Sequence, residues 1–177
     1  MLDRLAVLDQ ILEDHAPALG RDYQPYRNHA YRVANFAWCM RPGTLEDLYV
    51  LTVAVAFHDL GIWTAGSFDY LAPSEALARA YLEGQQRTEL IPVVVAMIGE
   101  HHRVSPVPPG HDPRIEAFRR ADWIDVSLGL CRFDLQPEDF NRILRRFPRL
   151  GFHRRLLRFS LKHALQHPLR PLPMLKR

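Results

Sequence analysis

Cysteine is scarce in this chain, and the scarcity excludes two classes of small protein. The 177 residues include only Cys39 and Cys131, which lie 92 positions apart and outside any CxxC pair. Disulfide-stabilised domains and zinc ribbons need several closely spaced cysteines. We therefore expect two reduced thiols in the core and no disulfide.

Long hydrophobic runs are also missing. The longest nearly apolar run, residues 48–57, has ten residues, whereas a membrane-spanning helix needs ~20. The first residues have neither the basic region nor the small-residue cleavage site of a secretory signal. We expect a protein with no membrane partner and, by default, a cytoplasmic location.

Acidic residues are absent from the last fifth of the chain. Residues 1–141 carry 12 basic and 20 acidic side chains, a net charge of −8, whereas residues 142–177 carry 11 basic and no acidic ones, a net charge of +11. Such a segment attracts anions, which include nucleic acids, anionic substrates and acidic protein surfaces. The charge alone does not choose among these partners.

The last expected helix, at about residues 152–167, favours ordinary packing over nucleic-acid binding. Leu157, Leu161 and Leu165 form an apolar stripe at helical spacing, and Arg155 and Arg158 lie on another face. We interpret the stripe as the face that packs on the domain, and we expect no specific nucleic-acid partner. A homo-oligomer stays an alternative, in which the basic face of one copy docks on the acidic part of another.

The remaining composition indicates one helical domain spanning residues 1–177. The length fits a single domain of roughly 100–200 residues, and 47% hydrophobic residues exclude a disordered chain. Caps and breakers predict seven or eight helices, at about residues 5–12, 25–40, 44–60, 73–84, 88–103 and 113–129, with the last two starting at 137 and 151. The β-branched residues 53–55 and 93–95 also suit buried strands, but each group lies inside a longer run with helical caps. The prediction is an all-α protein.

An adjacent imidazole and carboxylate, His58-Asp59, end the most apolar of these expected helices. Burial of an unpaired carboxylate is unfavourable, so Asp59 requires a cation or several hydrogen-bond donors. A metal ion is one solution. A cap or surface pair at the helix end is the other.

Two more candidate ligands lie on other expected helices. His29 lies beside the core-facing stripe of residues 25–40, and Asp122 is surrounded by apolar residues at helical spacing. With His58 and Asp59 they supply two imidazoles and two carboxylates, which suit a divalent transition metal or, less well, Mg²⁺. We expect one divalent ion, with Mn, Co, Ni, Fe, Zn and Mg as candidates, and coordination positions left for water or substrate.

The order of these residues resembles the HD-domain metal-dependent phosphohydrolase superfamily. His29, His58-Asp59 and Asp122 follow the H, HD, D order of that family, and FHDLG and ADWID are similar to its HD-L/I-G and A-D motifs. The resemblance covers about residues 25–127. It implies an HD-domain-like bundle with a core of about five helices. We expect the basic helices 137–167 of this chain to pack on that core. The resemblance also implies a metal bound by the four named residues and hydrolysis of phosphate esters of nucleotides or related compounds.

Two departures from the family pattern limit this expectation. Many members have a lysine after HD-I/L-G, but this chain continues with Ile62 and Trp63-Thr64. Two-metal members carry extra histidines before the last aspartate, and residues 74–83 supply none. One metal is therefore expected. His101 and His102 are candidates for a second-site ligand, a phosphate contact or a proton donor, and a pair at a helix end is the alternative.

The expected activity is a metal-dependent hydrolase acting on a small phosphorylated molecule, with a nucleotide as one candidate. Asp59 would both bind the metal and orient the attacking water, and a protonated His101 or His102 would assist the leaving group. The segment 61–72, with Trp63 and Tyr70, is a candidate pocket wall. An HD-type hydratase, lyase or iron oxygenase stays open as an alternative, as does a non-catalytic module that binds metal or nucleotide.

Overall fold

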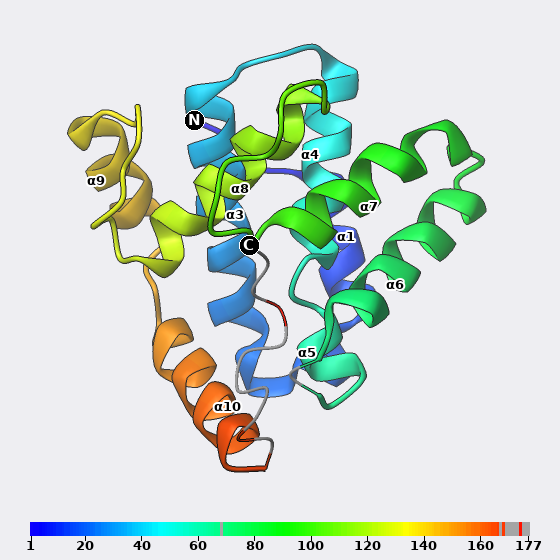
Figure 1. Cartoon of the computed structure of the whole chain (residues 1–177), viewed down its shortest axis with the longest axis vertical. Coiled ribbons are helices and arrows are strands. Elements are labelled where there is room, and N and C mark those ends of the chain that lie inside the picture. The colour runs from blue at the N-terminus through cyan, green and yellow to red at the C-terminus, as the bar shows by residue number, and fades with distance from the viewer. Residues whose placement is uncertain (68, 167, 169–173, 175–177) are drawn as a thin grey trace.

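The computed structural model describes residues 1–67, 69–166, 168 and 174, without the side chains of 162 and 166, and every regular element in this part is a helix. The all-α prediction is therefore confirmed (Figure 1). The elements are α1 (Ala6–Asp14), α2 (Ala16–Leu19), η1 (Gly20–Asp22), α3 (Tyr23–Met40), α4 (Leu45–Phe57), α5 (Gly61–Thr64), α6 (Leu71–Gly84), η2 (Thr88–Leu90), α7 (Ile91–Glu100), α8 (Pro113–Val126), α9 (Pro137–Arg146) and α10 (Phe152–Gln166). None of the described helices has the length and apolar character needed to cross a membrane.

Capping chemistry decides where two of the central helices begin. Thr44 accepts a hydrogen bond from the backbone N–H of Asp47, whose side chain accepts one from the backbone N–H of Thr44. This reciprocal capping box starts α4 where the sequence predicts it. Asp112 caps α8 in a similar way, by accepting from the backbone N–H of Arg114 at 2.9 Å.

Helix α4 lies at the centre of the core, with every residue from Val50 to Phe57 buried. It packs against α1, α3, α6 and α7, and α3 packs along α8. Burial explains why β-branched residues occur in α4 and α7: residues 50–57 of α4 are all buried, and α7 buries Ile91, Val94, Met97 and Ile98. Both segments are helical, so the strand alternative is wrong. The predicted helix through Leu60 ends at Phe57 instead, and a turn at residues 58–60 leads directly into α5.

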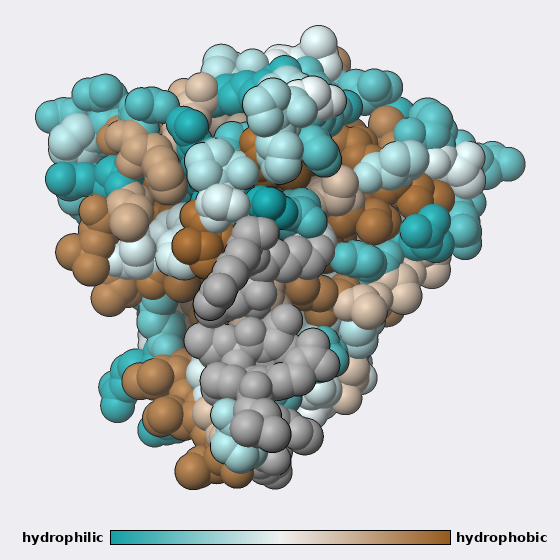
Figure 2. Space-filling view, viewed as in Figure 1, coloured by the Kyte–Doolittle hydropathy of each residue, from teal (hydrophilic) through white to brown (hydrophobic). Residues whose placement is uncertain are grey.

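Helix α10 packs with a different face from the predicted one. Its leucine stripe is exposed, with exposed fractions of 59% at Leu157, 56% at Leu161 and 85% at Leu165. Figure 2 shows hydrophobic surface at the outer edge of the molecule where α10 lies in Figure 1. The face that meets the domain carries Phe152 and Leu156. The stripe prediction is wrong because the helix has two apolar faces, and periodicity does not reveal which one packs.

The cysteine prediction is only partly right. Cys39 and Cys131 are both free, as expected, but both are exposed and not in the core. Cys39 lies near the end of α3, and Cys131 lies in the connection after α8. Neither thiol takes part in the buried cluster described next.

Candidate metal centre

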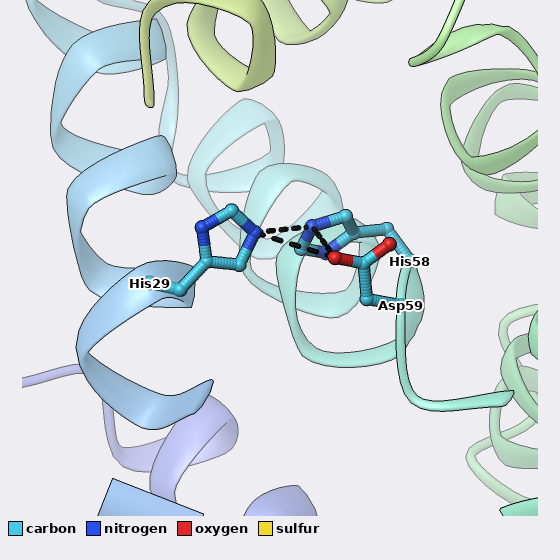
Figure 3. Close-up of side chains that lie close together, drawn as sticks. All are labelled: His29, His58 and Asp59. Carbon is cyan, nitrogen blue, oxygen red and sulfur yellow. Dashed lines mark hydrogen bonds and ion pairs between the residues drawn. The ribbon is translucent and has the colours of Figure 1, made fainter. Parts of the chain in front are cut away.

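Four residues predicted as ligands meet at one buried point. His29 comes from α3, His58 and Asp59 from the turn after α4, and Asp122 from α8. Figure 3 shows His29, His58 and Asp59 directed toward one another. The Nε2 atoms of His29 and His58 lie 2.9 Å apart, and each lies 3.5 Å from Oδ2 of Asp59. Asp122 Oδ1 lies 3.6 Å from His29 Nε2, and all four side chains are at most 2% exposed.

Hydrogen bonds behind the cluster orient its histidine rings. His58 Nδ1 donates to the carbonyl of Val55 at 3.0 Å, and His101 Nδ1 donates to that of Ile98 at 2.6 Å. A carbonyl only accepts, so the proton of each neutral ring lies on Nδ1 and the Nε2 lone pair faces the cluster. Partners of this kind hold metal-binding histidines in the required tautomer.

The carboxylates of the cluster lack partners on the side that faces the histidines. Oδ1 of Asp59 and both carboxyl oxygens of Asp122 are buried and form no hydrogen bond with any described residue. Burial raises the pKa of Asp122 to about 7, with the Asp59 charge adding to the effect against the attraction of His101 and His29. Burial also acts on Asp59, but the surrounding imidazoles hold its pKa well below the usual range. Unpartnered oxygens beside imidazole lone pairs are the donor set that a divalent transition metal takes.

A proton resides between the histidines when no metal is bound. Burial lowers the pKa of His29, but hydrogen bonds to Asp125 and Asp59 and the charges of Asp125 and Asp122 raise it to about 9. Burial, together with the charges of His29 and His101, lowers the pKa of His58 to about 3. His29 is then the cation and donates to the Nε2 lone pair of His58 at 2.9 Å. A metal ion at this point replaces a positive charge that the site already holds.

His101 and His102 lie on the other side of the same carboxylates. His101 Nε2 is 3.4 Å from Asp59 Oδ1, and His102 Nδ1 is 3.5 Å from Asp122 Oδ2. Asp59, His101 and His102 form a second group whose ligand atoms lie within 4.8 Å of one another. Asp59 therefore belongs to both groups: its Oδ2 faces His29 and His58, and its Oδ1 faces His101. The second group could hold a second ion, whereas the sequence predicted one.

Sequence reasoning missed Asp125, which lies behind His29. Its Oδ2 accepts from His29 Nδ1 at 2.6 Å, and Arg32 donates to its two oxygens at 2.6 and 2.8 Å. The arginine and histidine outweigh the effect of burial and hold the pKa of Asp125 far below its usual range. The spacing in ADWID could have indicated Asp125, because positions 122 and 125 share one face of a helix and both acids then point the same way.

Tyr70, in the segment after the HD pair, lies against the histidine pair, and the role of this segment as a pocket wall stays a prediction. Tyr70 forms a 2.7 Å hydrogen bond with His102 Nε2, and Trp63 donates from Nε1 to Asp22 at 3.1 Å. Gly61 permits this approach, because a Cβ there would lie 2.5 Å from the carbonyl oxygen of Tyr70. Phe68, in the same segment, lies outside the described residues.

Comparisons with protein-family models, with curated proteins and with solved structures find no match for this chain. His29, His58 and Asp59 form one group of candidate ligands, and Asp59, His101 and His102 form a second. Asp122 lies beside both groups, and this arrangement fits a metal ion of undetermined identity.

Proposed function

We propose that this chain is a metal-dependent hydrolase of the HD type that cleaves a small phosphorylated molecule, with a nucleotide as the first candidate. The observation that carries the proposal is the convergence of His29, His58, Asp59 and Asp122 from three separate parts of the fold, in the H, HD, D order of that family. Orphaned carboxylate oxygens at the same point support it, because buried carboxylates without partners are unfavourable unless a cation compensates them.

The residues of the site have distinct roles in such a reaction. A bound divalent metal supplies a water of lowered pKa and offsets negative charge that develops on phosphoryl oxygens. Asp59 directs Oδ2 toward His29 and leaves Oδ1 to accept a hydrogen bond from the attacking water, which orients it. His101 lies 3.4 Å from that oxygen and, when protonated, donates from Nε2 to the leaving group. Tyr70 holds His102 in position through its hydroxyl.

A second candidate is a non-catalytic metal-binding module, and one specific observation favours it. All four expected ligands are at most 2% exposed, and a structural metal site is closed whereas a catalytic one keeps an open position. This candidate predicts saturable binding of metal or nucleotide without turnover. An HD-type hydratase, lyase or iron oxygenase predicts a preference for iron or zinc and no phosphate release.

A metal-supplemented screen separates these functions. Metal-free protein is incubated with Mn²⁺, Fe²⁺, Co²⁺, Ni²⁺, Zn²⁺ or Mg²⁺ and a panel of nucleotides and other phosphate monoesters, and released phosphate is measured. The proposal expects metal-dependent release by the wild type and a loss of at least about a hundredfold in Asp59→Asn. The matched control is Asp134→Asn, whose carboxylate is 82% exposed. Tight metal binding without release from any ester would exclude the hydrolase.

A further inference from the structure

The closed state of the metal centre conflicts with the activity proposed for it. His29, His58, Asp59, His101 and Asp122 are each at most 2% exposed. A hydrolase must admit substrate and water to such residues, so some covering element has to move. The elements over the centre differ in how firmly they are attached.

Helix α10 supplies the cover over His29. The ring of Phe152 stacks on the ring of His29, with centroids 4.1 Å apart and planes 17° apart, and Phe152 is 1% exposed. Figure 1 shows α10 as an outer helix beside the first half of α3 and joined to α9 by an extended connection. Its outer face is exposed to solvent, so only one side holds it to the domain.

The connection into α10 has the geometry of a hinge. Asn28 donates to the carbonyl of Pro148 at 2.8 Å and anchors the connection to α3. Two residues later, Leu150 and Gly151 have φ angles of 47° and 82°. A leucine in the left-handed region is strained, and such residues are common where a chain changes direction. The strain lies between an anchored point and the first residue of α10.

An ion pair also holds the domain-facing side of α10 to the rest of the fold. Arg155 Nε lies 2.6 Å from Asp22 Oδ1, with Arg155 22% exposed and Asp22 8% exposed. Arg155 follows Phe152 by three positions and therefore lies on the same face of α10. The backbone carbonyl of Asp125 accepts a further hydrogen bond from His153 at 2.8 Å.

We propose that α10 is a lid over the metal centre, which turns about Leu150–Gly151, lifts Phe152 from His29, and is held closed by the Asp22–Arg155 ion pair. The inference rests on the proposed metal site and concerns access to it. Asp22 and Arg155 are separate from the ligand cluster, so loss of the pair should change how fast the site opens and not how tightly it holds an ion.

Metal exchange kinetics test this. Co²⁺ uptake by metal-free protein and Co²⁺ removal by excess chelator are followed by absorbance in wild type, Asp22→Asn and Arg155→Gln. The lid predicts that both rates rise by roughly three- to fivefold, the factor available from one partly exposed ion pair, while the Kd is unchanged. Gly151→Ala should act in the same direction, because no atom lies within 4 Å of the added Cβ and only the φ of +82° is disfavoured.

The matched control breaks an ion pair that does not involve α10. Asp3 and Arg146 lie 3.2 Å apart and join the N-terminal segment to α9, so Asp3→Asn with Arg146→Gln should leave both rates at the wild-type value. If Asp22→Asn and Arg155→Gln speed Co²⁺ removal but leave Co²⁺ uptake unchanged, the ion pair supports the geometry of the ligands, and the lid proposal is wrong. Unchanged rates in both directions would also overturn it.

Hydrogen exchange of the metal-free protein supplies a readout that needs no ion. The lid predicts faster amide exchange in α10 and in the turn at residues 58–60 for Asp22→Asn than for wild type, with α8 unchanged. If the wild type binds no Co²⁺, the metal site is wrong, and hydrogen exchange still decides whether α10 opens. Equal exchange in variant and wild type would exclude the lid even if metal binds.

Discussion

His29 and His58 face each other through their Nε2 atoms at 2.9 Å, although the Nδ1 atom of each ring already donates its proton elsewhere, to Asp125 and to the Val55 carbonyl. Two such neutral rings would place two lone pairs in contact. The contact is stable only with a cation between them, either a proton or a metal ion. The predictions about metal binding follow from this relationship.

Metal binding should release a proton at neutral pH. The pKa of His29 is about 9 in the metal-free protein, so at pH 7 the ring is protonated and its proton must leave before Nε2 binds an ion. Apparent affinity should therefore rise with pH up to about 9 and then level off. Calorimetry in buffers of different ionisation enthalpy should give about one to one and a half protons released per ion at pH 7, about one from His29 and about half of one from Asp122, whose pKa is raised to about 7. An affinity independent of pH between 7 and 9 would contradict this protonation state.

Asp122→Asn should have opposite effects on the metal-free and metal-loaded proteins. Burial raises the pKa of its carboxyl to about 7 from the ordinary aspartate value of 3.8. Because the folded state holds the Asp122 proton more tightly than the unfolded state, protonation of Asp122 adds to the unfolding free energy. This contribution is fully present below about pH 3.8 and is lost as the pH rises to about 7. The asparagine variant avoids that loss, so at pH 8 the metal-free variant should exceed wild type in unfolding free energy by on the order of 1–4 kcal/mol.

With saturating metal, the wild type should have the larger unfolding free energy. It binds the ion through the Asp122 carboxylate, which the variant lacks, and so gains more binding free energy. Chemical denaturation with and without Co²⁺ at pH 4.5 and pH 8 measures both effects. If Asp122 is instead paired with protein donors, the metal-free variant will be less stable than wild type at both pH values.

Asp59→Asn should lose activity and metal affinity while the chain stays folded. The substitution removes one carboxylate from a site with two, so repulsion with Asp122 decreases while the ligand and the group that orients water are lost. Thermal melting, metal content and phosphate release are measured on the same preparation. Wild-type turnover per folded Asp59→Asn molecule would exclude the proposed mechanism.

Asp125→Asn should weaken metal binding through His29. Loss of a carboxylate behind a metal-binding histidine typically reduces affinity about 10- to 100-fold. The single variant also leaves Arg32 buried without its charge partner, which costs about 3–5 kcal/mol. The double variant Arg32→Gln, Asp125→Asn should recover much of the stability and none of the affinity. Recovery of both would show that Asp125 is only a structural partner of Arg32.

Gly61→Ala should destabilise the protein for a reason of packing. The new Cβ would lie 2.5 Å from the Tyr70 carbonyl and 2.9 Å from Ser74 Oγ, so the segment that carries Tyr70 must shift at a cost of about 1–3 kcal/mol. Gly84→Ala is the matched control, since no atom lies within 4 Å of its added Cβ. Equal melting temperatures for the two variants would contradict this account.

Local chemistry was sufficient to predict the helical elements and to select residues that the fold brings together as candidate ligands. Capping at Thr44 and Asp112 and the apolar run of α4 depend on neighbours within a few positions, so they can be recognised without the fold. The same holds for His58-Asp59, because an acid that directly follows a buried apolar run needs a partner wherever that run packs. The apolar neighbours of His29 and Asp122 marked them as further candidates, the HD order supported the set, and the structure brings them to the same point.

Tertiary packing decided the contacts that join distant segments. Asp125 reaches His29 and Arg32 across more than ninety positions, and periodicity does not show which acid will lie behind which histidine. The outward leucine stripe of α10 was equally hidden, because a helix with two apolar faces packs on whichever face the neighbouring surface accepts. The cover over the metal centre follows from that choice, since it brings Phe152 onto the His29 ring.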